Sequence, residues 1–225
     1  MSRALPIGDP VDDIPVEALG RASLRGRGLE LAAVDAERDC ADLFAAAHGS
    51  TRKEEVWTYM AYGPFANEAT MLSWLEECAA NEDTIFYSVR DRSSGRALGM
   101  ASLLAIDPTH RHVEMGNIWY GPDVQGGTTN TETAQLLLRE AFQRGYRRVE
   151  WKCDALNERS RRAALRLGFR FEGIFRQHMV IKGRNRDTAW FSMLSSEWPT
   201  ADAAMERWLT CQDGTPPPLA SLRCD

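Results

Sequence analysis

Two loops of this chain carry residue types and spacings that suit an anionic ligand. The first, QGGTTNT at residues 125–131, lies between a predicted strand and a predicted helix. Backbone N–H groups at the start of a helix attract anions, and glycine lets a phosphate approach the backbone closely. An ordinary connecting loop, capped by threonine and asparagine, is the alternative. The candidate phosphate-binding residues are Gln125, Gly126, Gly127, Thr128, Thr129, Asn130 and Thr131.

The second loop, NERSRR at residues 157–162, also follows a predicted strand and opens a predicted helix. Asn157 and Ser160 suit two interpretations, because they can cap the helix or place polar groups at the mouth of a sheet. The arginines either form a solvated helix face or bring one guanidinium, that of Arg162, close to a phosphate. Each loop alone is weak evidence, since glycine-rich turns and capped helices are common.

The elements that must position these loops follow from hydrophobic periodicity and from turn residues. Strands are predicted over residues 24–34, 84–91, 97–106, 112–120, 149–153, 169–182 and 188–194. Helices are predicted over residues 35–47, 68–80, 131–144, 157–167 and 201–209, and the aromatic segment 57–67 is predicted to be a loop. The order is strand, two helices, three strands, helix, strand, helix and two strands. It indicates an α+β sheet with interleaved helices.

The two ends of the chain differ from its middle in composition. Residues 1–20 carry three prolines and little periodicity, which predicts an extended N-terminal arm. Residues 199–225 are predicted to hold a short helix and a tail with prolines at 216–218. No internal repeat or second boundary is evident, so residues 21–198 are expected to form one domain.

Composition narrows the class of protein. The chain has 225 residues, 44% hydrophobic and 26% charged, with a net charge of −5 and no basic stretch, which argues against a nucleic-acid partner. No segment reaches the ~18 apolar residues of a membrane span, and the start does not resemble a signal peptide. The five cysteines lie at no metal-ligand spacing, which predicts free thiols, no metal and a cytoplasmic location. No Gly-Lys-Ser/Thr sequence follows the glycines, which disfavours a nucleoside triphosphatase.

Taken together, the order of elements and the two loops resemble the GNAT superfamily of N-acetyltransferases, over residues 24–198. Within it they are similar to the branch of RimJ/RimL-type ribosomal-protein N-terminal acetyltransferases. The local markers are EMG at 114–116, the loop at 125–134, and N-x-x-S at 157–160 followed by LGFRFEG at 167–173. The resemblance implies a mixed, mostly antiparallel twisted sheet with a V-shaped splay between strands 4 and 5, flanked by helices. It also implies acetyl-CoA as cosubstrate.

The same resemblance assigns the cosubstrate to particular positions. The strand that splays, at Trp119 and Tyr120, is expected to bind the pantetheine arm through its backbone. The family's pyrophosphate loop is Q/R-x-x-G-x-G/A, and this chain has Gln125 first but Thr128 and Asn130 at the two small-residue positions. Threonine costs little there if its φ is negative, and more if the loop needs a positive φ.

The catalytic residues are also expected from the resemblance. Asn157 is placed against the pantetheine or the acceptor amine, and Ser160 near the sulfur, where a hydroxyl can protonate the leaving thiolate. Transfer is expected to be direct, from acetyl-CoA to a primary amine, so a base must accept a proton. Glu114 is the candidate base, and strand alternation groups it with Ile118 and Tyr120 unless a bulge intervenes. A purely structural carboxylate is the alternative, and the weaker candidates are Glu150 and Asp154.

The acceptor is expected to be a small molecule or a peptide or protein N-terminus. Its site is predicted to be lined by the aromatic loop 57–65, by Trp119 or Trp151, and by the turn at 182–187. Arg184, Arg186 and Asp187 can meet an acidic or peptide acceptor, or simply be solvated. Two further alternatives stay open: a catalytically silent acyl-CoA-binding regulatory module, and a homodimer paired through an exposed strand edge near the C-terminus.

Overall fold

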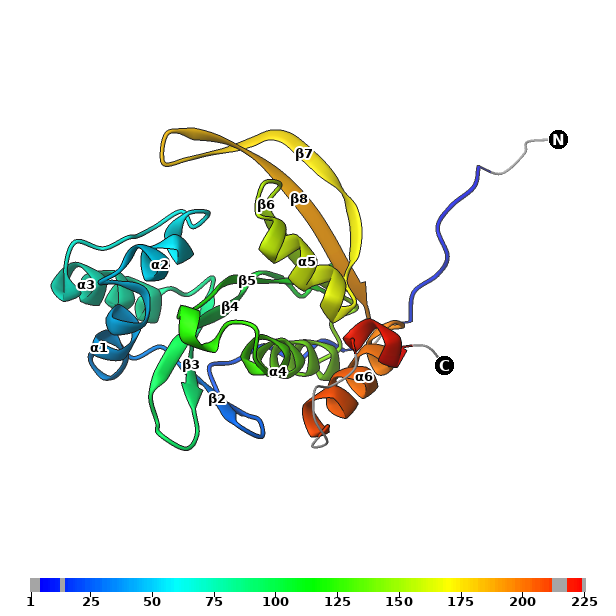
Figure 1. Ribbon diagram of the computed structural model, residues 1–225. Coiled ribbons are helices and arrows are strands. Elements are labelled where there is room, and N and C mark those ends of the chain that lie inside the picture. Colours follow the sequence, from blue (N-terminus) through cyan, green and yellow to red (C-terminus); the bar gives the residue numbers. More distant parts are fainter. Residues whose placement is uncertain (1–4, 13–14, 212–217, 224–225) are drawn as a thin grey trace.

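The computed structural model describes residues 5–12, 15–211 and 218–223, and it contains one eight-stranded sheet beside six α-helices (Figure 1). The sheet order is β1-β2-β3-β4-β5-β6-β8-β7, and only β5 and β6 are parallel neighbours. The strands are β1 (Leu24–Arg25), β2 (Leu29–Ala33), β3 (Ile85–Asp91), β4 (Ala97–Asp107), β5 (His112–Tyr120), β6 (Arg148–Asp154), β7 (Arg170–Ile181) and β8 (Arg184–Leu194). The helices are α1 (Ala36–Ala47), α2 (Thr51–Glu54), α3 (Glu68–Ala80), α4 (Thr129–Gln143), α5 (Glu158–Leu167) and α6 (Trp198–Thr210). The predicted α+β, mostly antiparallel sheet is confirmed.

The predicted first strand, residues 24–34, was wrong as a single element. A turn at Gly26–Gly28 divides it into β1 and β2, which pair with each other. The buried carboxylate of Glu132 on α4 accepts hydrogen bonds from the backbone N–H groups of Gly28 (2.9 Å) and Leu29 (3.3 Å). A Cβ atom on Gly26 would lie 2.2 Å from that carboxylate, so a side chain at this position would displace the Glu132 carboxylate. Because of the extra strand, the predicted strands 4 and 5 are β5 and β6 here.

The helix boundaries follow from local caps. Asp35 caps α1 by accepting from the Arg38 N–H (2.9 Å), as predicted. Asn67 and Thr70 form a capping box at the start of α3, which matches the predicted range. The short α2 and the 3₁₀ turn Glu55–Trp57 were not predicted, because α2 buries no side chain and so leaves no hydrophobic period.

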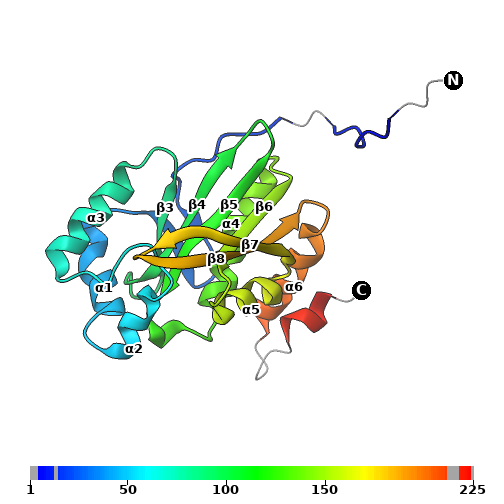
Figure 2. The ribbon, with the colours of Figure 1, turned by 90° about the horizontal axis from the view of Figure 1, so that it is seen from above.

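The hairpin of β7 and β8 turns more tightly than the predicted polar turn at 183–186. Lys182 and Gly183 both have positive φ (49° and 74°), as in a two-residue hairpin turn, so β8 already begins at Arg184. Figure 1 shows this hairpin leaving the sheet as a long arch, and Figure 2 shows it crossing above the body of the molecule. The predicted C-terminal helix is likewise longer, because Pro199 is tolerated in the first turn of α6.

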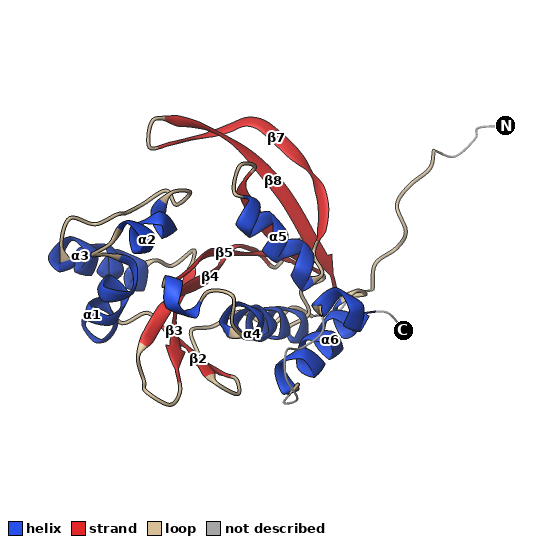
Figure 3. Cartoon of the chain, in the orientation of Figure 1, coloured by secondary structure: helices blue, strands red, loops and turns tan. Residues whose placement is uncertain are grey.

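Two hydrophobic cores lie on opposite faces of the sheet. Figure 3 shows helices on both sides of the strands. The larger core joins the sheet to α4, α5 and α6, and the smaller one joins it to α1 and α3. The arm contributes to the larger core, since Val16 and Leu19 pack against it and the Glu17 N–H donates to the Arg144 carbonyl (2.9 Å). Residues 1–4, 13–14 and most of the proline segment at 216–218 lie outside the described residues. The division of the chain at residues 20 and 198 stays a prediction.

Trp57 is the centre of the smaller core and anchors the aromatic loop to β5. Its side chain is 1% exposed, its ring centroid lies 4.8 Å from that of Trp119, and its Nε1 donates to the Ala47 carbonyl (3.0 Å). The chain then passes through Gly63 (φ 61°) and a cis Gly63–Pro64 peptide, and a Cβ on Gly63 would lie 2.6 Å from the indole. The loop therefore closes tightly around one tryptophan.

Replacing Trp57 by alanine should lower the free energy of unfolding by about 3–5 kcal/mol, because a buried aromatic leaves a cavity and an unpaired carbonyl. Urea denaturation followed by circular dichroism measures the change. Phe175→Ala is the control, since that ring is 55% exposed and its loss should cost clearly less. Equal effects of the two substitutions would contradict this account of the core.

Candidate active site

The site begins where β5 and β6 part. Their parallel pairing runs only from His112 opposite Arg148 to Glu114 opposite Glu150. In the described part of the chain, no strand pairs with that edge of β5 between Met115 and Tyr120. A cavity of about 900 Å³ lies at this gap, and residues of both strands line it. The splay predicted between these strands is therefore present.

A bulge at Asn117 turns β5 within the gap. Asn117 has a φ of 51°, and the register with β4 shifts between Gly116 opposite Ser102 and Trp119 opposite Met100. Its amide Nδ2 donates to the Ser102 hydroxyl (2.9 Å), which holds the bulge in place. The bulge changes which side chains share a face of the strand.

The prediction that Glu114 shares a face with Ile118 and Tyr120 was wrong for this reason. Ile118 and Tyr120 belong with the larger core, whereas Trp119 belongs with the smaller core on the opposite face. Glu114 and Gly116 both lie on that second face. A Cβ atom added to Gly116 would be 3.1 Å from the Glu114 carboxylate. The carboxylate and the Trp119 indole therefore belong to the same side of the sheet.

Glu114 is a buried carboxylate, 3% exposed, in an ion pair with Lys152 on β6 (Oε2 to Nζ, 2.7 Å). Burial raises the pKa of Glu114, and the nearby Lys152 ammonium opposes that rise. The Lys152 ammonium also lies 5.2 Å from the ring centroid of Trp190. Sequence reasoning missed Lys152, although strand alternation puts it on the same face of β6 as Glu150, which lies opposite Glu114.

The two weaker candidate bases are engaged elsewhere. The Glu150 carboxylate pairs with Arg148 (2.8 Å), and the Asp154 carboxylate accepts from the Leu156 N–H (2.8 Å). Asp154 still lines the cavity, but Glu150 does not. Glu114 is thus the carboxylate that best combines burial, a cationic neighbour and access to the cavity.

Ser160 and Asn157 lie across the gap from β5, at the start of α5. The Asn157 side chain accepts from the Ser160 N–H (3.1 Å), which confirms that it caps the helix. The Ser160 hydroxyl accepts from the Trp151 indole (3.0 Å). Burial raises the pKa of the Cys153 thiol, and the nearby Ser160 hydroxyl opposes that rise. Both side chains line the cavity.

The predicted phosphate loop adopts a conformation that explains its unusual glycine positions. Gly126 has a φ of 81°, while Thr128 has a φ of −77° and caps α4 without a side-chain hydrogen bond. The loop position that needs a positive φ is therefore occupied by a glycine, Gly126. Thr128 occupies a position with a right-handed helical backbone, which suits a residue with a Cβ. Gln125 donates from Nε2 to the Tyr120 carbonyl (2.9 Å), which ties the loop to the end of β5.

The structure brings only part of the predicted binding set to the cavity. Trp119, Tyr120, Gln125, Gly126, Asn130 and Arg162 line it, and Arg162 also pairs with Glu158 (3.0 Å). Gly127, Thr128, Thr129 and Thr131 do not line it. Thr129 and Thr131 are buried, and the Thr131 hydroxyl accepts from Arg166. Gly127 and Thr128 could therefore contact a phosphate only through their backbone N–H groups at the start of α4.

The far side of the cavity is covered by the loop before α3 and by the β7–β8 hairpin. Tyr59 donates from its hydroxyl to the Leu156 carbonyl (3.2 Å), and Lys182 at the hairpin tip donates to the Trp57 carbonyl (3.0 Å). Of the predicted aromatic lining, Trp57 and Phe65 do not face the cavity, because they fill the smaller core. Its walls here are formed by Tyr59, Met60, Met179, Ile181 and Arg186.

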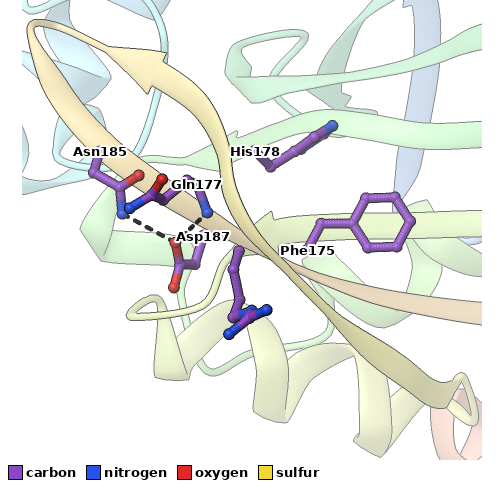
Figure 4. Close-up of a pocket in the computed structure, with 6 residues that line it drawn as sticks. Phe175, Gln177, His178, Asn185 and Asp187 are labelled. Carbon is purple, nitrogen blue, oxygen red and sulfur yellow. Dashed lines mark hydrogen bonds between the residues drawn. The ribbon is translucent and has the colours of Figure 1, made fainter.

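The hairpin carries a second hollow, on residues 175–187, where β7 bulges opposite Asp187 (Figure 4). Gln177 there has a φ of 50°, and its N–H donates to the Asp187 carboxylate (2.7 Å). Asn185 donates to the same carboxylate (3.0 Å), and His178 contacts the Thr188 hydroxyl (2.9 Å). These contacts hold the bend that carries the hairpin over the cavity.

Comparison with known proteins identifies this chain as an acyltransferase. A family model described as Acetyltransferase (GNAT) domain matches residues 29–170, more than half of the chain. A GCN5-related N-acetyltransferase from Brucella melitensis superposes with a TM-score of 0.88 at 40% identity, over 93% of this chain and 97% of that one. A probable GNAT-family acetyltransferase from Chromobacterium violaceum ATCC 12472 gives 0.80 at 38% identity, over 88% of this chain and 100% of that one. The chain belongs to the GNAT acetyltransferase family, as its sequence predicted.

A curated relative agrees with the RimJ/RimL-like branch. It is named "Putative ribosomal N-acetyltransferase YdaF", from Bacillus subtilis (strain 168), and is 31% identical over 105 residues. The match covers 46% of this chain and 57% of that protein, so the chain spans little more than half of its length. In the described residues, no helix is long and apolar enough to cross a membrane, and no group of three potential metal ligands occurs.

Lys152→Met should destabilise the folded protein in a pH-dependent way. Without the ammonium, the effect of burial on Glu114 is opposed less, and the pKa of Glu114 rises further in the folded state. The penalty should be small below pH 4.5, where the carboxyl is protonated in both states, and should grow as pH rises through the folded-state pKa. We expect about 2 kcal/mol at pH 8.

Urea unfolding between pH 4 and 8 measures this effect. The double substitution Glu114→Gln with Lys152→Met is the control, because it removes both charges and should show no such trend. A penalty for Lys152→Met that is equal at both ends of the range would contradict the ion pair.

Proposed function

We propose that this protein transfers an acetyl group from acetyl-CoA directly to a primary amine. The observation that carries the proposal is one cavity with Glu114 on β5 and Ser160 on α5, on either side of the gap between parallel strands. One residue is suited to remove a proton from the acceptor, and the other to supply one to a leaving group. Membership of the GNAT family supports the same reaction.

The residues around the gap suit coenzyme A. Its pantetheine arm carries amides, and the edge of β5 offers backbone groups that pair with no strand beyond Glu114 in the described residues. Its pyrophosphate is anionic, and α4 begins without a side-chain cap beside Gly126. The Cβ of Thr128 is accommodated at a negative φ, so the departure from the family's loop does not remove the site. Use of acetyl-CoA is general in this family.

The proposed step forms a C–N bond and breaks a C–S bond. The amine nitrogen attacks the thioester carbonyl carbon, and its surplus proton passes to the Glu114 carboxylate, directly or through one water. The departing sulfur takes the proton of the Ser160 hydroxyl, Ser160 regains one from water, and Glu114 releases its own to water, so the proton count balances. Asn157 positions Ser160 through its cap of the Ser160 N–H and retains its amide Nδ2 for the pantetheine or the amine.

The acceptor in this proposal is a small amine or the N-terminus of a peptide or protein. The name of the Bacillus subtilis relative supports the second class, as does the RimJ/RimL-like branch. A cytoplasmic location and pairing of two chains belong to the same proposal. β7 is the outermost strand of the sheet and exposes Phe171, Phe175 and Val180. Two chains would pair through this strand.

Two substitutions test the catalytic assignment. Ser160→Ala and Glu114→Gln should each lower kcat by about 10²–10⁴-fold, the range for loss of a general acid or base, while acetyl-CoA binds with unchanged affinity. Calorimetry measures the binding, and thiol release with a panel of amines measures the rate. Tight binding without turnover on any amine, unchanged by Ser160→Ala, would instead favour a silent acyl-CoA-binding module. No binding would exclude both functions.

Gly126→Val should weaken acetyl-CoA binding by about tenfold or more, because a β-branched residue at φ 81° distorts the loop. Gly127→Ala is the matched control: its φ is not positive, and an added Cβ would meet only the Val124 carbonyl at 3.7 Å. Calorimetry of both variants separates the cases. Equal affinities would show that the backbone of this loop does not hold the pyrophosphate.

A further inference from the structure

The charged side chains around the cavity have partners in the structure, with one exception. Glu114 pairs with Lys152 at 2.7 Å, as described above. The other paired groups are Arg162 with Glu158 (3.0 Å), Arg159 with Glu55 (3.9 Å) and Asp154 with the Leu156 N–H (2.8 Å). Among the charged side chains that line the cavity in the described residues, Arg186 alone has neither a hydrogen bond nor an ion pair.

Arg186 is half-buried, and its Nε atom is fully buried without a hydrogen-bond partner. Buried polar groups in folded proteins are nearly always hydrogen-bonded, and an unpaired one is costly. A guanidinium cannot lose its charge, so it cannot avoid this cost by deprotonation. The carboxylate that acts electrostatically on Arg186, Glu114, is already ion-paired with Lys152, so the guanidinium in the cavity wall suits a further anion supplied by a ligand.

The placement of Arg186 follows from strand alternation. Arg186, Thr188 and Trp190 share one face of β8, and Trp190 lies opposite Lys152 in the register with β6. Lys152 in turn contacts Glu114. The guanidinium thus faces the same side of the sheet as the proposed base. Asp187, its neighbour, faces the other way, into the hollow of Figure 4.

The hairpin holds Arg186 in this position from both ends. On one side Asp187 fixes the bulge of β7 through Gln177 (2.7 Å) and Asn185 (3.0 Å). On the other, Lys182 ties the tip to the Trp57 carbonyl (3.0 Å). Arg184, two residues earlier, is exposed and does not line the cavity. The bend therefore presents one arginine of the hairpin to the cavity and leaves its neighbour in solvent.

We propose that Arg186 determines acceptor specificity, by binding a carboxylate carried by the acceptor amine. This inference rests on the proposed function. A planar guanidinium binds a carboxylate with two parallel hydrogen bonds, and a neutral carboxamide cannot replace them, since its NH₂ group opposes another donor. The acceptor class is then an amino acid or a peptide with an acidic group near its free amine.

Amines matched in pairs test this inference: amino acids against their amides, and dipeptide amides beginning with aspartate or glutamate against those beginning with asparagine or glutamine. The wild-type protein should prefer the carboxylate member of at least one pair by about tenfold in kcat/KM, mainly through KM. Arg186→Gln should abolish that preference, so that the ratio of kcat/KM between the two members of each pair falls to about one. Arg186→Lys should keep part of it, because it keeps the charge without the planar fork.

Arg184→Gln is the control and should keep the full preference. Acetylation of both members of every pair with equal efficiency would overturn the inference and leave the proposed function standing, as would an unchanged preference in Arg186→Gln. If no amine is acetylated, calorimetry of the N-acetylated pairs with CoA-bound protein replaces the rates. The same preference for the carboxylate member is then expected, and equal affinities would overturn the inference.

Discussion

Three residues after their pairing begins, the parallel strands β5 and β6 separate, and the rest of the site depends on that separation. Interior strands of a sheet normally satisfy their backbone groups on both sides. Here β5 keeps β4 as a partner along its length, while its other edge faces a cavity. The gap thus provides both an opening through the sheet and a row of backbone donors and acceptors for a ligand.

Side chains on both sides of the gap are positioned by local features of the backbone. The Asn117 bulge redirects the end of β5 so that Glu114 and Trp119 share a face. On the opposite wall, the Asn157 cap and the Trp151 indole fix Ser160 at the start of α5. A rigid sheet and a helix terminus therefore hold the two proposed proton-transfer groups, which is the arrangement that direct transfer between two bound substrates requires.

Much of the fold follows from patterns that are local in the sequence. Strand alternation and helical periodicity predicted most element boundaries within a few residues, and the caps at Asp35 and Asn157 are where the residue types indicate. The errors have separate tertiary and local causes. Glu132, over a hundred residues away, splits the first strand by binding the turn at Gly26–Gly28. The hairpin turn at Lys182 is tighter than its polar neighbours suggested.

The site was less predictable than the fold, because it depends on registers between distant strands. Residue types and position before predicted helices singled out the loops at 125–131 and 157–162, and resemblance to a family supplied the catalytic roles of Ser160 and Asn157. The Lys152 partner of Glu114 follows only from the β5–β6 register, and the face of Glu114 follows only from the bulge. Arg186 and Arg184 look equivalent in sequence, and only the bend of the hairpin distinguishes them.

A crystal structure with a non-hydrolysable acetyl-CoA analogue tests the central claim most directly. The account predicts the pantetheine arm along β5 from Met115 to Tyr120, and the pyrophosphate at the backbone amides that begin α4. The acyl group should then lie between Ser160 and Glu114. An analogue bound outside the gap, or one whose acyl group points away from both side chains, would contradict it.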